Sequence, residues 1–285
     1  MLRILFKHNG VIKEFSSGEE IVEEMANYFG LNENQRTAFL RTTYRKEDRI
    51  KRSLLWHRLL FRAADSLAKQ ELVSRPTATF LVTHKKEWML TESGFDEALR
   101  LLSVPKTQKE FLSTKSFEVE KIVKKLNEAP RPENYNPFDK GKKTSKITIE
   151  SALRIRGFRQ AVIEAYDYKC AFCGMKICSP DSLLWEVQAA HIVPHSSMGK
   201  DDILNGIALC HVHHWAFDVG WFTLHNDFGI QVSSKANVLP SDFGRMGNSV
   251  GVLSSIRPKI LLPKRREIYP HPNAITWHRE NIFHC

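Results

Sequence analysis

The chain has 285 residues, 42% of them hydrophobic and 26% charged, which is typical of a globular protein with about two domains. No uninterrupted apolar run approaches the ~18 residues that cross a bilayer, which excludes a membrane-spanning chain and indicates no membrane partner. A formal net charge of +10 at pH 7 favours an anionic partner such as nucleic acid over a cationic one.

The first residues carry no secretory signal. Arg3 interrupts the apolar stretch at residues 1–6, and no small-residue cleavage pattern follows. We therefore expect a cytoplasmic protein.

Apolar periodicity and turn residues predict several elements in the first hundred residues. We expect strands at 2–7, 11–15, 80–83 and 88–90, and helices at 16–30, 34–42, 51–70 and 95–102. Asn9-Gly10 is typical of a hairpin turn between the first two strands. The apolar residues that share one face of the long helix are Leu54, Leu55, Leu59, Ala63 and Leu67. Helices followed by a hairpin are the order of a winged helix.

The stretch from Trp88 to Gly94 (W-M-L-T-E-S-G), with the segment 69–73 before it, resembles the N-terminal winged-helix domain of Mrr-type restriction enzymes. The resemblance covers about residues 17–105. It implies a DNA-recognition domain at 1–105, preceded by the short hairpin. A helical scaffold that binds only protein is the alternative, because a fold alone does not determine function.

Residues 106–147 are expected to form a charged helical linker, which prolines interrupt from Pro130 on. Two basic segments lie nearby: residues 41–62 carry eight basic and two acidic residues, and residues 140–159 carry seven and one. Such a run is often only a solvated face, but it also suits phosphate contacts. The expected DNA contacts are Arg45, Arg49, Arg52, Lys142, Lys143, Arg154, Arg156 and Arg159.

Cysteines gather in the second half of the chain, where four of the five lie within 41 residues. Such clustering favours metal binding over a disulfide framework. Cys170 with Cys173, and Cys210 with His213, form two pairs with the same two-residue gap. Together they provide four ligands for a tetrahedral structural Zn²⁺. Unrelated buried cysteines are the alternative, but they leave the shared gap unexplained.

The segment from Val187 to Asp218 is predicted to be a strand, a loop, a second strand and a helix. His191 lies on the first strand and Asn205 closes the loop. On the helix, His213 and His214 project about 100° apart, so they can serve different sites.

His191, Asn205 and His214, together with the two zinc-binding pairs, resemble the His-Asn-His (HNH) nuclease family. The resemblance covers about residues 150–285. It implies a ββα-metal nuclease domain with a zinc knuckle at 148–285, which makes the whole chain α+β. It implies that His191 is the general base, that Asn205 fixes the loop, and that His214 holds Mg²⁺ or another divalent ion. Asp218, one turn after His214, is a further candidate ligand.

One position departs from the family pattern. Many members have Asp directly before the general base, where this chain has Ala190. The missing oxygen ligand is left open: Asn205, Asp201, Asp202, Asp218, water or the DNA itself would serve.

The function that the sequence predicts is a metal-dependent endonuclease of restriction type that cuts double-stranded DNA. The sequence leaves open whether a DNA modification is required. A homodimer is expected, because cutting both strands generally requires two active sites. The alternatives are a catalytically inactive zinc-containing DNA-binding protein, and a nuclease acting on single strands or RNA.

Overall fold

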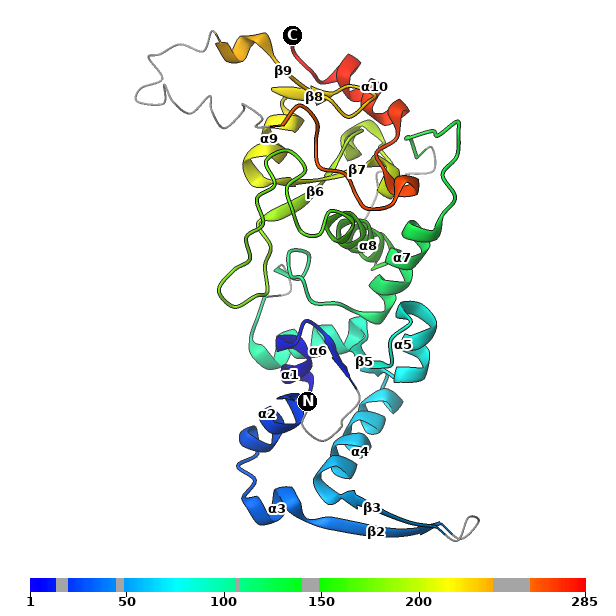
Figure 1. Cartoon of the computed structure of the whole chain (residues 1–285), viewed down its shortest axis with the longest axis vertical. Helices are drawn as coiled ribbons and strands as arrows, with labels where there is room; N and C mark the ends of the chain where they lie inside the picture. The colour runs from blue at the N-terminus through cyan, green and yellow to red at the C-terminus, as the bar shows by residue number, and fades with distance from the viewer. Residues whose placement is uncertain (14–19, 45–48, 106–107, 140–148, 238–256) are drawn as a thin grey trace. The chain divides into compact units, whose positions relative to one another are not determined.

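The computed structural model describes residues 1–13, 20–44, 49–105, 108–139, 149–237 and 257–285 (Figure 1). These residues form two compact units, Met1–Lys121 and Ile122–Cys285. None of the helices within these ranges is both long enough and apolar enough to cross a bilayer.

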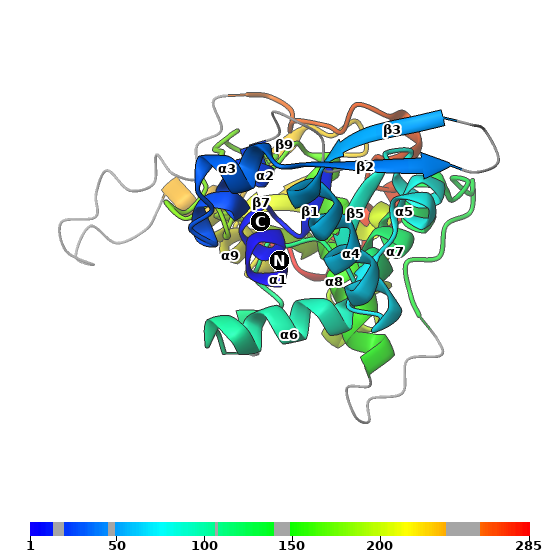
Figure 2. The same cartoon turned by 90° about the horizontal axis from the view of Figure 1, so that it is seen from below.

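The first unit has a three-stranded antiparallel sheet and a separate two-stranded ribbon. Its elements are α1 (Leu2–Lys7), β1 (Val11–Lys13), α2 (Glu20–Tyr28), α3 (Glu33–Thr37), β2 (Phe39–Tyr44), β3 (Arg49–Leu54), α4 (Leu55–Lys69), β4 (Val73–Ser74), α5 (Pro76–Thr83), β5 (Glu87–Leu90) and α6 (Glu92–Leu102). The sheet order is β1-β5-β4, and its core includes Phe6, Met89 and Phe95. β2 and β3 pair along their full lengths, as Figure 2 shows.

The prediction of an opening hairpin is wrong. Residues 2–7 form α1, because Leu2, Leu5 and Phe6 recur at helical spacing and are all buried. Asn9 and Gly10 do adopt positive φ, at 58° and 82°, but they connect a helix to β1. β1 then pairs with β5, from much later in the chain.

The long helix predicted at 51–70 is shorter in the structure. Its first residues form β3, and α4 begins only at Leu55. The face with Leu59 is exposed, whereas Leu60 and Ala64 are buried. Both faces satisfy the same four-residue spacing, so periodicity alone could not select the buried one.

The expected strand at 80–83 is the last part of α5, which starts with Pro76 at its first position. β4 and β5 do pair antiparallel, with this helix between them in sequence. The winged-helix domain at 1–105 stays a prediction, as do the domain boundaries.

The second unit contains the predicted strand, loop, strand and helix. Its elements are α8 (Ile149–Ala165), β6 (Val187–His191), η2 (His195–Ser197), η3 (Ile203–Asn205), β7 (Gly206–Cys210), α9 (His211–Asp218), β8 (Phe222–Leu224), β9 (Ile230–Val232), η4 (Ser234–Asn237), η6 (Arg266–Ile268) and α10 (Pro272–Asn281). α7 (Phe117–Glu128) begins in the first unit and ends in this one. β6 pairs with β7, and β8 with β9, both antiparallel.

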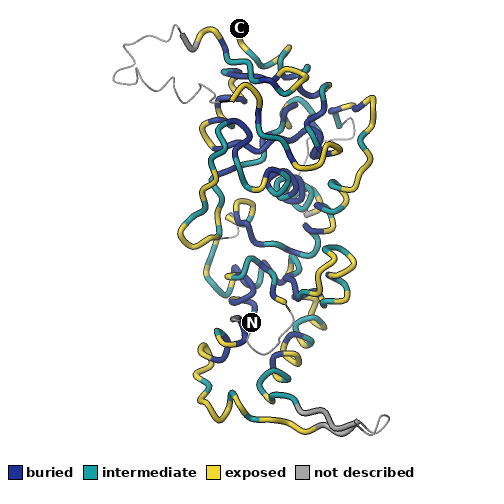
Figure 3. Tube along the Cα trace, viewed as in Figure 1, coloured by how far each residue is buried: buried dark blue, intermediate teal, exposed yellow. Residues whose placement is uncertain are grey.

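α8 packs against the β6–β7 ribbon, and Figure 3 shows much of this helix as buried. Gly206 lies directly opposite His191 in the ribbon. A Cβ atom at Gly206 would lie 2.4 Å from Val162 Cγ2 and 3.0 Å from Phe158 Cε2. Only glycine therefore permits this close approach of α8 to β7.

The buried ring of His278 joins α10 to β8 and to α9. Its Nδ1 accepts from the Thr223 hydroxyl at 2.9 Å, and its Nε2 donates to the Phe217 carbonyl at 3.1 Å. The ring also stacks on Phe217, with 3.7 Å between centroids. Burial lowers the pKa of His278 to about 4.

We expect His278 to make the second unit sensitive to acid. Between pH 6.5 and about 4, the unfolded chain binds a proton at this ring that the folded chain does not. The free energy of unfolding therefore falls as the pH decreases through this window, by about 3 kcal/mol in total.

Urea unfolding of the wild type and His278→Gln at a series of pH values tests this expectation. The variant should lose less stability than the wild type between pH 6.5 and 4. Equal losses in the two proteins would show that His278 does not titrate as described.

Candidate active site and metal centre

Four predicted zinc ligands come together in the second unit. Cys170 and Cys173 lie in a turn before β6, Cys210 ends β7, and His213 lies in the first turn of α9. Their ligand atoms all lie within 4.8 Å of one another. His213 Nδ1 is 2.9 Å from Cys210 Sγ and 3.7 Å from Cys170 Sγ. These separations suit a tetrahedral ion with bonds of about 2.0–2.3 Å.

The backbone places the cysteine turn beside β7. Ala171 N donates to the Ala208 carbonyl at 2.7 Å, which ties the turn to the strand. Gly174, at a φ of 80°, closes the turn, and its N donates to the Cys170 carbonyl at 2.8 Å. The turn thus directs two thiols toward the end of β7.

The three thiols strongly affect one another's ionisation. The neighbouring Cys173 and Cys210 lower the pKa of the Cys170 thiol, while Cys170 raises the pKa of Cys210. Crowded thiols resist ionising together unless a cation compensates their charge, and thiolate ligands select soft or borderline ions. The donor set therefore fits Zn²⁺ and not Mg²⁺.

His191, the predicted general base, stands at the end of β6. Its Nε2 lies 3.0 Å from Asp201 Oδ1, and its ring stacks on Phe158 with 4.1 Å between centroids. Because a carboxylate only accepts, this contact places the ring proton on Nε2. Within the described part of the chain, Nδ1 makes no hydrogen bond, so its lone pair can accept a proton.

Asn205 closes the loop between β6 and β7 and is fully buried. Its Oδ1 accepts from Val193 N at 2.8 Å. Its Nδ2 donates to the carbonyls of Val193, at 3.1 Å, and Lys200, at 3.0 Å. One side chain therefore fixes the backbone just after His191 and just before Asp201.

His214 and Asp218 lie one turn apart on α9. His214 Nδ1 donates to Gln188 Oε1 at 2.7 Å, and Gln188 Nε2 donates to His211 Nε2 at 2.8 Å. The lone pair of His214 Nε2 then faces Asp218 Oδ2 at 3.4 Å. A nitrogen lone pair and a carboxylate oxygen at this distance suit a shared divalent cation.

The electrostatic environment agrees with a ligand role for this pair. Burial lowers the pKa of His214, while the Asp218 carboxylate opposes this shift and His191 adds to it. The net direction favours the neutral ring that a metal ligand requires. Burial also raises the pKa of Asp218. His191 acts on both groups as a smaller effect that lowers each pKa.

The expected DNA-contact residues fall into different environments. Arg45, Lys142 and Lys143 lie outside the described residues, and Arg49 and Arg52 belong to β3 with their side chains outside them. Arg156 is only 7% exposed, which suits packing better than a phosphate contact. Arg154 Nε lies 2.9 Å from Asp201 Oδ2, and Arg159 is half-buried.

The sequence did not reveal two of the polar partners in this site. The sequence predicts Gln188 only as part of a strand, and Asp201 only as one possible oxygen ligand. A polar residue among the apolar residues that precede His191 is the one available signal for Gln188. The pairing of Asp201 with His191 depends on how the loop returns, which spacing does not show.

Of the comparisons with known proteins, the sequence-family match supports a nuclease domain in this unit. The sequence pattern described as HNH endonuclease matches residues 170–225, so an HNH endonuclease domain lies there. A solved structure titled "Modification dependent TagI restriction endonuclease" is similar at 19% identity and a TM-score of 0.31. The similarity covers 44% of this chain and 37% of that chain. No curated protein matches the chain.

We expect zinc content to depend on the four clustered ligands alone. Cys173→Ser should lose bound zinc and lower Tm by more than about 10 °C, because structural zinc supplies folding free energy directly. Cys178→Ser is the matched control, since Cys178 lies near in sequence but outside the cluster.

Inductively coupled plasma mass spectrometry of the purified proteins, with thermal unfolding, measures both effects. Full zinc occupancy in Cys173→Ser, or equal loss in Cys178→Ser, would show that the ligand set is wrong.

Proposed function

We propose that the chain is a metal-dependent endonuclease of restriction type that hydrolyses phosphodiester bonds in double-stranded DNA. The observation that carries this proposal is the arrangement of His191. Its Nε2 is paired with Asp201, which leaves Nδ1 as the proton acceptor of the neutral ring. The match of residues 170–225 to the HNH endonuclease pattern supports the same activity.

In the proposed reaction, a water oxygen attacks the scissile phosphorus while His191 Nδ1 takes one of its protons. The bond from phosphorus to the 3′ oxygen breaks, and that oxygen takes a proton from solvent. The products carry a 5′ phosphate and a 3′ hydroxyl. The positive charge that forms on the His191 ring faces the Asp201 carboxylate.

His214 and Asp218 would hold Mg²⁺ or another divalent ion. When bound, such an ion neutralises phosphate charge and stabilises the developing charge on the leaving oxygen. Asp218 would supply the carboxylate oxygen that Ala190 lacks. The Zn²⁺ held by the four-ligand cluster would act only on the structure, because all four of its positions are filled by protein.

We assign DNA recognition to the first unit, as a winged-helix domain, with the β2–β3 ribbon and α4 as the contacting elements. The register places Arg41 opposite Arg52. A two-stranded ribbon also has the dimensions to enter the major groove.

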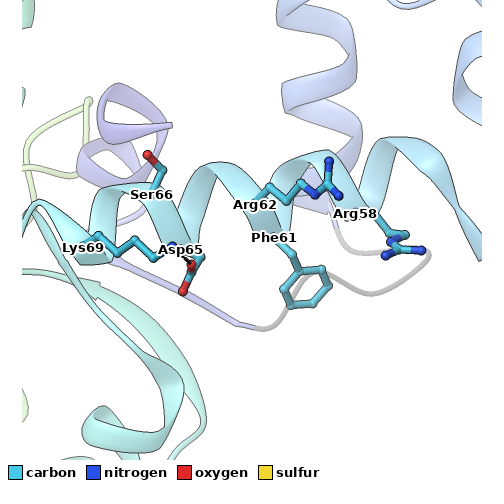
Figure 4. Close-up of a pocket in the computed structure, with 6 residues that line it drawn as sticks. All are labelled: Arg58, Phe61, Arg62, Asp65, Ser66 and Lys69. Atoms are coloured by element: carbon cyan, nitrogen blue, oxygen red, sulfur yellow. Dashed lines mark ion pairs between the residues drawn. The ribbon is translucent and has the colours of Figure 1, made fainter. Parts of the chain in front are cut away.

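One side of α4 continues this basic surface. Figure 4 shows Arg58 and Arg62 projecting from the helix on either side of Phe61. They border a shallow depression of about 550 Å³ that extends along the helix to Lys69. At the far end, Asp65 pairs with Arg75 and Lys69.

For the complete activity we propose a cytoplasmic homodimer, in which each copy cuts one strand. The cleavage assay determines whether a modified base is required, because it compares cleavage of different substrates. Modified and unmodified duplexes, single strands and RNA are compared side by side.

His191→Ala should lower the rate of duplex cleavage with Mg²⁺ or Mn²⁺ by about 100-fold or more, because it removes the general base. DNA affinity should stay unchanged. His225→Ala, an exposed histidine of the same unit, is the control and should cut normally. If the wild type cuts none of these substrates with any divalent ion, the protein is not a nuclease.

Arg58→Gln combined with Arg62→Gln should weaken DNA binding and reduce its salt dependence. The slope of log K against log salt should decrease by about two, one for each lost phosphate contact. Lys85→Gln with Lys86→Gln removes the same charge from an exposed turn elsewhere in this unit.

Fluorescence anisotropy with a labelled duplex over a sodium chloride series gives both slopes. If both double variants showed the same slope of log K against log salt, the DNA would not bind at Arg58 and Arg62.

A further inference from the structure

We propose that Asp201 is a positioning residue that fixes the tautomer and orientation of His191, and that Arg154 holds Asp201 in place. This inference rests on the proposed function. Asp201 is a buried carboxylate on the loop between β6 and β7. Arg154 lies on α8 and is one of the residues that the sequence predicts to contact DNA.

The first support is the geometry of the carboxylate. Asp201 Oδ1 lies 3.0 Å from His191 Nε2, and Asp201 Oδ2 lies 2.9 Å from Arg154 Nε. The Asp201 side chain is only 1% exposed. A buried carboxylate is costly unless it is paired, and here a cation and a ring N–H both meet it.

The same geometry separates Asp201 from the metal ligands. Each of its oxygens already faces a nitrogen donor, and its burial leaves little room for the water that Mg²⁺ keeps. By contrast, His214 Nε2 and Asp218 Oδ2 face each other, and both atoms carry lone pairs that a cation can use. Asp201 is therefore placed to act on the base and not on the ion.

The backbone around Asp201 is fixed from two directions. The Asn205 side chain donates to the carbonyl of Lys200, the residue before it. Residues 137–139 pair with 198–200: Lys200 N donates to the Pro137 carbonyl, and Asp139 N to the Met198 carbonyl, each at 2.8 Å. Asp139 Oδ2 also lies 3.7 Å from an Arg154 nitrogen.

These contacts define what Asp201 does for proton transfer. With the proton of the neutral ring on Nε2, the Nδ1 lone pair can accept the proton of the attacking water. The ring then carries one positive charge, which the Asp201 carboxylate balances. The carboxylate itself gains and loses no proton.

Asp201→Asn changes this arrangement with almost no change in volume. Arg154 would attract the amide oxygen, which turns the amide NH₂ toward His191 Nε2. Nε2 must then accept, so the ring proton moves to Nδ1 and the base is blocked. We expect kcat to fall by about 100-fold or more, with KM and DNA affinity within about 3-fold of the wild type.

Nitrogen-15 NMR of the zinc-loaded protein at pH 8 tests the tautomer without any cleavage. The His191 signals are assigned by their loss in His191→Gln. The wild type should show a protonated Nε2 and Asp201→Asn a protonated Nδ1. A wild-type ring with its proton on Nδ1 would overturn the proposal, whether or not Asp201→Asn folds.

Cleavage kinetics provide the second measurement, with Asp227→Asn as a matched control. Asp227 is an exposed aspartate of the same unit, paired with Lys259. Asp227→Asn should cut normally, whereas wild-type rates in Asp201→Asn would overturn the proposal. If even the wild type does not cut DNA, the proposed function fails, while NMR still decides the role of Asp201.

Arg154→Gln separates the two roles open to Arg154. If Arg154 acts through Asp201, kcat should fall about 10-fold while DNA affinity and its salt dependence stay constant. A salt slope reduced by about one, with kcat unchanged, would make Arg154 a phosphate contact and contradict this part of the proposal.

Discussion

The hydrogen bonds of Asn205 are the constraint on which the candidate active site depends. The loop between β6 and β7 carries His191 at its start and Asp201 near its end, and a loop of this length would otherwise be variable. Asn205 bonds both backbone groups of Val193 and the carbonyl of Lys200, so both residues are fixed by one buried side chain. Because its polar atoms are satisfied internally, Asn205 can be buried without a large desolvation cost.

The residues of α9 belong to two different sets of candidate metal ligands. The zinc-type cluster joins the turn at Cys170 to the start of α9 and so sets where that helix begins. Because α9 starts there, His214 bonds Gln188 on β6 and faces Asp218 one turn later, so nitrogen and oxygen donors meet at one place. The soft sulfur ligands suit Zn²⁺, whereas His214 and Asp218 would suit Mg²⁺ or another harder divalent ion. The two sites would therefore not compete for one metal.

Much of this site could be predicted because its signals are local. The two-residue gaps of the cysteine pairs, and the spacing of His191 to His214, are fixed by short turns and one helix. The predictions are wrong where contacts between residues distant in the sequence determine the structure. Residues 2–7 form a helix because their apolar face meets the rest of the first unit, and Leu59 is exposed because the neighbouring Leu60 is the one that packs. The His191–Asp201 pair depends on the return of a loop, which no periodicity describes.

The most direct test of the central claim is anomalous diffraction from crystals of the protein soaked with Mn²⁺. Data at the zinc and manganese edges distinguish the two ions. The account predicts zinc among Cys170, Cys173, Cys210 and His213, and manganese between His214 and Asp218, with Asp201 bound to His191 and no ion. Manganese on Asp201, or no manganese near His214, would contradict it.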